Sequence, residues 1–374
     1  MVGRRRSFWA STAQLVICAV LGGSVVLFTD SRGLGGQGDA RAASVTPVDP
    51  ANADATKAVT GKSVFPMEEP IRLAFGGDVH FEGALSDALA ADPAGMLAPI
   101  APVLQSADLA IVNLETAITT GGSAAPKTYN FRAPPSALTA LQSAGIDLVS
   151  MANNHGLDYG AEGLADSLAA EEAVGLPVIG IGRNEDEAYA PHMATVRGQT
   201  VAFIGATQVL DSALAASWTA GPDHPGLASA KRVERLVAEV SAAGGKADIV
   251  VVFLHWGVET ASCPSRDQQQ LARQLVDAGA DVIVGGHAHR LQGAGRMDAA
   301  MTAYGLGNFA FYAGGGLGAQ SGVLTVTVGG RKGVEYQWTP AVIRHGIPHP
   351  LAGPDAQGAV ADFERLRTCT GLSP

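Results

Sequence analysis

Short apolar runs alternate with helical patterns through the middle of the chain. The runs have the length and composition of strands buried in a sheet, whereas the segments between them repeat with a helical period. The predicted strands are Ile71–Phe75, Leu109–Val112, Leu148–Met151, Val201–Ile204, Ile249–Leu254 and Val282–Val284. The clearest predicted helices are Gly160–Ala173, Ala230–Ala242 and Gln268–Ala278. This alternation predicts an α/β domain in which helices cover buried sheets.

The pattern changes near the C-terminus. After about Gly293 it indicates short β-like segments, including Gly322–Val328 and Gly333–Ala341, and a final helix over Gln357–Arg367. We therefore expect one domain over residues 70–345 and a C-terminal helical tail over residues 346–374 that packs on it.

The N-terminal segment differs from the rest. Three arginines, Arg4 to Arg6, precede an apolar run from Phe8 to Phe28. About 20 apolar residues can cross a bilayer as a helix, and flanking arginines favour a cytoplasmic N-terminus. We expect residues 1–29 to form a single-pass transmembrane anchor, with the following domain outside the cytoplasm. The alternative is secretion after signal cleavage, for which Ala40-Arg41-Ala42 offers a small-x-small site.

Residues 30–69 are rich in Gly, Ala, Asp, Thr and Pro without sustained periodicity, which predicts a flexible linker. The whole chain has 374 residues, 47% of them hydrophobic, and a net charge of −10. Residues 1–41 contain five arginines and two aspartates, so the remaining residues carry a net charge of −13. An exported domain this acidic is a poor candidate for binding nucleic acid.

Polar residues follow five of the predicted strands. The strands are followed by "GGDVH", "NLET", "ANNHGLDYG", "HWGVE" and "GGHAHR" in chain order. Ligands of open α/β sheets bind beyond the carboxyl ends of strands, where several loops converge. These five strand ends therefore predict one polar site.

The residue types in these segments suit a site with two divalent transition-metal ions, Zn, Mn or Fe. Asp78 and His80 are two residues apart, as are His287 and His289, so each pair would lie on one side of an extended segment. Glu115 could bridge two ions, while Asn154 and His255 could complete the second. Two ions about 3.5–4 Å apart can stabilise both the attacking and the leaving oxygen. His155 could then protonate the leaving group, with Asp158 orienting it.

The three cysteines contain no CxxC pattern, so cysteine ligands are not expected. Cys18 lies in the apolar run. Cys263 and Cys369 could form a disulfide in an oxidising compartment and tie the last helix to the domain, or they could be two separate thiols.

The ordered set of motifs, with "GNF" at Gly307–Phe309, resembles the CapA family, which is named for poly-γ-glutamate capsule synthesis and is related to calcineurin-like metallophosphoesterases. The similarity covers roughly Ile71 to Tyr312. It implies a metallophosphatase-like, four-layer αββα sandwich. It also implies that Asp78, His80 and His289 hold one ion, that Asn154, His255 and His287 hold the other, and that Glu115 lies between them.

Two departures from the superfamily pattern bear on activity. Glu115 stands where an aspartate usually bridges the ions, and Gly156 stands where an acidic residue usually follows the Asn-His pair, with Asp158 further along. The loop "KTYNFRAPP" also resembles a family feature. Its Lys127 and Arg132 could bind substrate carboxylates, or the loop could be solvated with its aromatic residues packed on the domain.

The resemblance implies an extracytoplasmic protein in the synthesis, export or attachment of an anionic polymer such as poly-γ-glutamate, working beside a membrane synthase complex. It would be a metal-dependent hydrolase of a γ-glutamyl amide or a phosphoester. Two alternatives remain open from the sequence. One is a phosphoesterase acting on a nucleotide or a lipid-linked phosphate. The other is a non-catalytic scaffold of a polymer-synthesis complex.

Overall fold

The computed structural model describes residues 69–374 except 313–314 and 330–332. The predicted anchor, the linker up to residue 68 and Cys18 lie outside the described residues. Among the described residues, no helix has the length and apolar character needed to cross a membrane.

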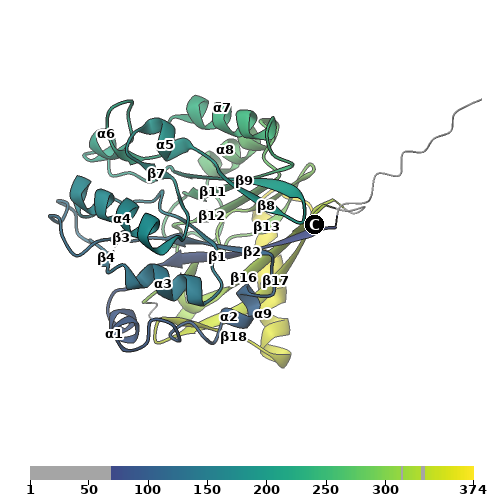
Figure 1. The fold of residues 1–374 in the computed structure, drawn as a ribbon. Coiled ribbons are helices and arrows are strands. Elements are labelled where there is room, and N and C mark those ends of the chain that lie inside the picture. The colour runs from purple at the N-terminus through teal and green to yellow at the C-terminus, as the bar shows by residue number, and fades with distance from the viewer. Residues whose placement is uncertain (1–68, 313–314, 330–332) are drawn as a thin grey trace, which may run out of the picture. The chain divides into compact units, whose positions relative to one another are not determined.

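Two sheets form the framework of the domain (Figure 1). The first sheet has eight strands in the order β18-β17-β16-β1-β2-β5-β6, with β15 also pairing with β1. Its strands are β1 (Ile71–Val79), β2 (Leu109–Leu114), β5 (Leu148–Ser150), β6 (Val178–Ile179), β15 (Asn308–Ala310), β16 (Gln320–Val328), β17 (Glu335–Arg344) and β18 (Ile347–Pro350). Strands β1, β2, β5 and β6 are parallel, whereas β16, β17 and β18 are antiparallel to their neighbours.

The second sheet has six strands in the order β13-β14-β12-β11-β9-β8. These are β8 (His192–Val196), β9 (Gln199–Thr207), β11 (Ile249–His255), β12 (Val282–Gly286), β13 (Ala294–Met297) and β14 (Ala300–Ala303). Its four central strands are parallel. Two small ribbons are built from β3 (Ala117–Ile118) with β4 (Arg132–Ala133), and from β7 (Ile181–Gly182) with β10 (Gly226–Leu227).

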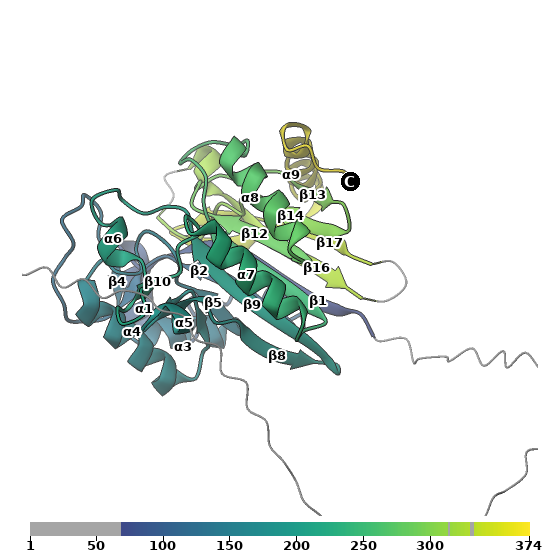
Figure 2. The ribbon, with the colours of Figure 1, turned by 90° about the horizontal axis from the view of Figure 1, so that it is seen from above.

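Helices cover the outer faces of both sheets (Figure 2). The longer helices are α1 (Ala84–Ala91), α3 (Ser136–Ser143), α4 (Gly160–Val174), α7 (Val233–Gly244), α8 (Arg266–Asp277) and α9 (Gly353–Leu366). The shorter ones are α2 (Ala101–Leu104), α5 (Glu185–Tyr189) and α6 (Ala215–Trp218), with 3-10 turns η1 (Gly316–Ala319) and η2 (Arg367–Cys369). All six predicted strands and the predicted helices are present, displaced by a few residues at their ends.

The buried side chains form three apolar cores that define four layers. One core lies between the two sheets and includes Phe75 of β1, Phe203 of β9 and Phe253 of β11. A second core joins the first sheet to α1, α3 and α4, and a third joins the second sheet to α7 and α8. The predicted αββα sandwich is therefore observed. The segment predicted as a helical tail starts with β18, and α9 follows, with its Phe363 stacked on Trp338 of β17.

An aspartate precedes each of four parallel strands and fixes it to its neighbour. The carboxylates of Asp108, Asp147, Asp248 and Asp281 each accept a backbone N–H from the adjacent strand. The backbone N–H of each of these aspartates donates to a carbonyl of the same neighbouring residue. This paired contact sets the register of each strand against its neighbour. The register determines where along the sheet the polar residues at the end of each strand lie.

Candidate metal centre

The polar residues predicted at the strand ends converge between the two sheets. Asp78 lies in β1, Glu115 directly follows β2, and Asn154 follows β5, all from the first sheet. His255 ends β11, while His287 and His289 follow β12, all from the second sheet. The site therefore draws donor groups from both sheets, at the carboxyl ends of parallel strands.

Glu115 is the central residue of this site. Its carboxylate is fully buried, and within the described residues neither oxygen has a hydrogen-bond partner. Its Oε1 lies 3.4 Å from His255 Nε2 and 3.9 Å from His289 Nε2. Burial raises the pKa of Glu115 to about 7. A buried carboxylate that lacks hydrogen bonds is costly unless a cation is close to it.

Two groups of side chains in the described residues have the spacing to hold a metal ion. One group is Glu115, His287 and His289, and the other is Asp78, Glu115 and His255, with ligand atoms within 4.8 Å of one another in each. Glu115 belongs to both groups. The buried Nδ1 of His287 also lacks a hydrogen-bond partner in the described residues. Carboxylate and imidazole donors left without partners in this way suit divalent transition metals, so the residues fit the predicted cofactor.

Asp78 is held by contacts from three directions. Its Oδ1 accepts a hydrogen bond from Asn113 Nδ2 at 2.8 Å, and its Oδ2 accepts one from the His287 backbone N–H at 2.9 Å. His289 Nδ1 lies 3.3 Å from Oδ2. A Cβ atom at Gly286 would stand 2.2 Å from Oδ1, so only glycine permits this approach.

The histidines differ in their charge. Burial lowers the pKa of His255 to about 3 and that of His287 to about 2, so both are neutral, the form that binds metals. Burial also lowers the pKa of His289, but attraction from Glu115 and the hydrogen bond to Asp78 outweigh it and raise this pKa to about 10. The pKa of His289 thus shifts in the opposite direction to those of His255 and His287, because His289 faces the Asp78 and Glu115 carboxylates.

The backbone of the last motif differs from the expected extended segment. His287 and His289 have φ values of 86° and 50°, in the left-handed region that non-glycine residues rarely adopt. The expectation that strand alternation brings the two imidazoles together is therefore wrong. A strained turn after β12 directs them instead, and such strain is typical of functional sites.

His80 lies apart from the two groups. Its Nδ1 accepts the backbone N–H of Glu82 at 3.0 Å, and its Nε2 lies 3.3 Å from the backbone N of Tyr312. Burial lowers the pKa of His80 to about 3. Because His80 belongs to neither of the two groups, the structure does not bring it together with Asp78 as a ligand pair.

Asn154 and His155 are held by side-chain contacts with other residues around the site. Asn154 Oδ1 lies 2.6 Å from His255 Nε2. His155 Nδ1 lies 2.6 Å from Asp158 Oδ2, and its Nε2 faces Glu115 Oε1 at 3.9 Å. The ring of Phe131 stacks on His155 at 4.0 Å. Asp158 and Phe131 thus hold the imidazole with Nε2 toward the centre.

The structure gives Lys127 and Arg132 different surroundings. Lys127 Nζ lies 2.5 Å from Asp158 Oδ1 and also donates to the Asn154 carbonyl, so its charge is paired inside the protein. Arg132 is exposed, and its guanidinium stacks over Tyr159 at 4.7 Å. The expectation that both residues are available to bind carboxylates is corrected for Lys127, because a buried carboxylate already occupies its ammonium.

A cavity of about 630 Å³ opens beside the centre. Lys127, Tyr129, His155, Trp218, Glu259 and His287 are among its lining residues. Tyr129 and Val258 at this opening are 65% and 58% exposed, which leaves an apolar rim around a polar interior. A ligand can therefore reach His155 and His287 from solvent.

Two asparagines that connect the ligands were not singled out from the sequence. Asn113 Nδ2 contacts both Asp78 Oδ1 and His255 Nδ1, so it links a residue of each sheet. Asn153 Nδ2 donates to Asn113 Oδ1, and its own Oδ1 accepts the backbone N–H of His155. Both stand inside the motifs "NLET" and "ANNH", and their position beside predicted ligands is the signal that could have found them.

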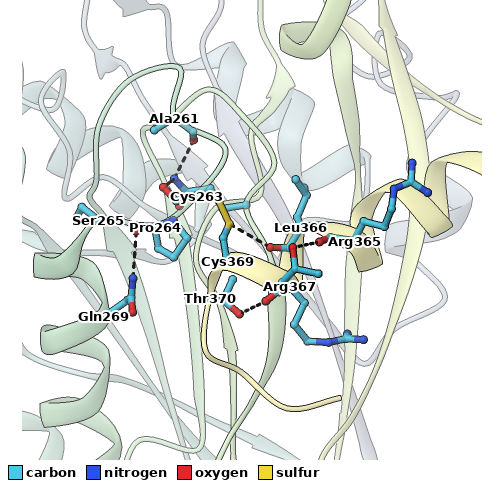
Figure 3. Close-up of a disulfide and its surroundings, with 12 residues drawn as sticks. Ala261, Cys263, Pro264, Ser265, Gln269, Arg365, Leu366, Arg367, Cys369 and Thr370 are labelled. Atoms are coloured by element: carbon cyan, nitrogen blue, oxygen red, sulfur yellow. Dashed lines mark hydrogen bonds between the residues drawn. A yellow bond between two sulfur atoms is a disulfide. The ribbon is translucent and has the colours of Figure 1, made fainter.

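A disulfide joins Cys263 to Cys369 (Figure 3). Cys263 lies in the loop between β11 and α8. Cys369 is the last residue of η2, which follows α9 in the sequence. The same loop carries Val258 and Glu259 at the opening of the cavity. The bond therefore ties one wall of the cavity to the C-terminal segment.

A family model and two relatives point to the same family. The model of the family described as bacterial capsule synthesis protein PGA_cap matches residues 72–313. The capsule biosynthesis protein CapA of Bacillus anthracis is 37% identical over 191 residues, which are 50% of this chain and 45% of that protein. The PGA biosynthesis protein CapA of Bacillus subtilis strain 168 is 29% identical over 303 residues, covering 79% of this chain and 78% of that protein. The match thus spans less than half the length of the Bacillus anthracis protein.

Among solved structures, a hypothetical protein from Thermus thermophilus aligns over 75% of this chain and 98% of its own chain. It has 19% sequence identity and a TM-score of 0.41, too low to add to what the sheets and layers show.

Proposed function

This chain belongs to the bacterial capsule synthesis protein family, and on this basis we propose that it acts in the synthesis, export or attachment of an anionic surface polymer such as poly-γ-glutamate. Two relatives carry capsule or PGA biosynthesis in their names. The single observation that carries a chemical role for this chain is the buried Glu115 carboxylate, which two potential ligand groups share.

In this proposal the Glu115 carboxylate would contribute to the binding of two divalent ions. His287 and His289 complete one ligand set, and Asp78 and His255 complete the other, with Asn154 close to His255. Bound ions would supply positive charge that stabilises anionic oxygens of the bond under attack. Zn, Mn and Fe all accept these donors.

The protein's own residues would position and protonate the substrate. His155 presents Nε2 toward the centre, because Asp158 holds its Nδ1 and Phe131 stacks on the ring. It can thus give a proton to a leaving amine or alkoxide. Asp158 is itself fixed by Lys127 and by the Phe131 backbone N–H at 2.6 Å. Lys127 supports this arrangement as a positioning residue.

We place this activity outside the cytoplasm, at the membrane or secreted. The apolar run after Arg4 to Arg6 supports export. The disulfide between Cys263 and Cys369 supports it independently, since such bonds persist in oxidising compartments. A partner synthase complex in the membrane would deliver the polymer to the domain.

The first experiment is elemental analysis of the purified full chain, with the double variant Asp78→Ala/His289→Ala as control. We expect about two equivalents of a transition metal in the wild type and a large loss in the variant. Metal-free protein after purification with Zn, Mn and Fe supplied would reject the metal centre and leave a scaffold role.

A second experiment separates the hydrolase from the scaffold. His155→Ala should retain metal but lose turnover of γ-glutamyl oligomers or phosphoesters, whichever the wild type cleaves. Cleavage of phosphoesters alone would favour the phosphoesterase alternative. Normal capsule assembly in cells that carry His155→Ala would reject a catalytic role.

A further inference from the structure

The segment from Tyr129 to Arg132 lines two cavities. Tyr129 lines the cavity at the metal centre, and Phe131 stacks on His155. Asn130 and Arg132 line a different cavity, of about 490 Å³. The two cavities share no lining residue, so one short segment contributes different side chains to both spaces.

We call this second space the Arg132 cavity. It is lined by Glu82, Ser86, Thr120, Asn130, Arg132 and Tyr159, among others. None of these residues belongs to either potential ligand group. The cavity is thus a separate polar space beside the metal centre.

The guanidinium of Arg132 is available for a ligand. It stacks over Tyr159, and no carboxylate of the described residues lies within ion-pair distance of it. Its backbone N–H, rather than its side chain, donates to Glu82 Oε1 at 3.1 Å. The planar fork of N–H donors matches a carboxylate in a bidentate arrangement.

The wall that carries Arg132 is fixed before any ligand binds. Asn130 Nδ2 donates to the carbonyls of Ala125 and Lys127, both at 3.1 Å. Arg132 and Ala133 also form β4, which pairs with β3. A preformed wall lowers the entropy cost of binding.

The other groups of the cavity complement an amide-linked acid. Glu82 is the acidic residue and Arg132 the basic residue of the lining, so a bound anion would be held by directional bonds more than by net charge. Its carboxylate can accept an amide N–H, while the hydroxyls of Ser86 and Thr120 can donate or accept. A carboxylate next to an amide N–H could pair with Arg132 and donate to Glu82 at the same time.

The described lining of the cavity at the metal centre offers no unpaired cationic side chain for this role. Its charged lining residues include Asp211 and Glu259, and its Lys127 is already paired with Asp158. Among the described residues, its lining therefore offers no free ammonium or guanidinium to a further carboxylate. Arg132 is an exposed cation of the same segment and lines the second cavity.

We propose that the Arg132 cavity is a subsite for the carboxylate of an amide-linked acidic residue, in a unit of the polymer other than the one at the metal centre. The class of polymer in this proposal is taken from the proposed function, on which the proposal therefore rests. Two sources share this chemistry, namely γ-linked and α-linked glutamyl chains.

The test measures binding of γ-glutamyl and α-glutamyl oligomers to the metal-loaded full chain by calorimetry at fixed ionic strength. Arg132→Gln should weaken binding at least about tenfold, because a charged hydrogen-bonded pair is lost. Arg132→Lys keeps the charge without the fork and should recover only part of the affinity. Arg266→Gln is the matched control, since it removes an exposed arginine at the start of α8.

Metal content and unfolding temperature should be unchanged in all three variants. Wild-type affinity in Arg132→Gln, or equal weakening in Arg266→Gln, would overturn the subsite, as would a wild type that binds neither oligomer. Binding of only the α-linked oligomer with the same dependence on Arg132 would support the subsite and reject poly-γ-glutamate as the polymer.

Discussion

Lys127 Nζ lies 2.5 Å from the Asp158 carboxylate, and the side chains are only 10% and 0% exposed. Asp158 in turn contacts His155 Nδ1. The ion pair therefore connects a loop at the cavity opening to the residue that we assign as proton donor.

Lys127→Met should destabilise the protein by about 3–5 kcal/mol, because it leaves a buried carboxylate without its cation. Lys127→Met/Asp158→Asn removes both charges and should recover most of this loss. The free energy of unfolding in denaturant measures both. Arg183→Met, which breaks an exposed ion pair with Glu172, is the control and should have little effect. Additive losses in the double variant would show that the two residues act independently.

Divalent ions should raise the unfolding temperature of the wild type, since they bind the folded site. A ligand at 100 times its dissociation constant stabilises by about 2.7 kcal/mol. Glu115→Gln should abolish most of this gain, because Glu115 belongs to both ligand groups. His80→Ala should keep the gain, because His80 lies outside both. An equal loss of the metal-dependent gain in the two variants would indicate that His80 is a ligand. The contact between His80 and Tyr312 would then have to open for metal to bind.

Asp281 provides a test of pH dependence away from the centre. Burial raises the pKa of its carboxyl, and the hydrogen bond from Val250 N–H offsets this only in part. The folded state therefore binds the proton more tightly than the unfolded state, so this group's contribution to stability falls as pH rises through the unfolded and then the folded pKa.

Asp281→Asn keeps an acceptor for Val250 and removes the buried charge. Its stability relative to the wild type should rise as the pH increases above about 4. Asp281→Ala loses the acceptor and should cost about 1–3 kcal/mol. Denaturant midpoints at several pH values measure both, with exposed Asp277→Asn as the control. A difference between Asp281→Asn and the wild type that does not change with pH would contradict the assignment.

Loss of the disulfide should lower stability by up to about 5 kcal/mol. The bond closes a segment with a sequence separation of 106 residues, and a loop of this length has a large closure entropy. Cys263→Ser/Cys369→Ser and wild type in reductant should show the same lower unfolding temperature. If reductant lowered the unfolding temperature of the serine variant by the same amount, the effect of reductant on the wild type would not come from this bond.

Most of the framework was predictable because buried parallel strands leave a clear apolar pattern. Asp78, Glu115 and His255 were found because each ends or follows such a strand. The distribution of the ligands between the two groups was not predictable. It depends on distances between residues that are far apart in the sequence and lie in different sheets. Strand alternation also failed for His287 and His289, because the chain leaves β12 through a left-handed turn.

A further sequence signal marks the start of four parallel strands. An alanine or isoleucine, an aspartate and then an apolar residue occur at β2, β5, β11 and β12, with the aspartates at Asp108, Asp147, Asp248 and Asp281. Each aspartate caps the neighbouring strand through a side-chain hydrogen bond. The pattern could therefore have fixed the register of these strands from the sequence.

The origin of the ligands in both sheets has a consequence for how the domain opens. Asp78 and Glu115 belong to one sheet, and His255, His287 and His289 to the other, so bound ions would act as crosslinks across the sandwich. The two halves could then separate only by giving up the ions. Amide hydrogen exchange in the central strands of both sheets should therefore slow together on metal addition, as one cooperative unit, while the antiparallel edge formed by β17 and β18 exchanges independently.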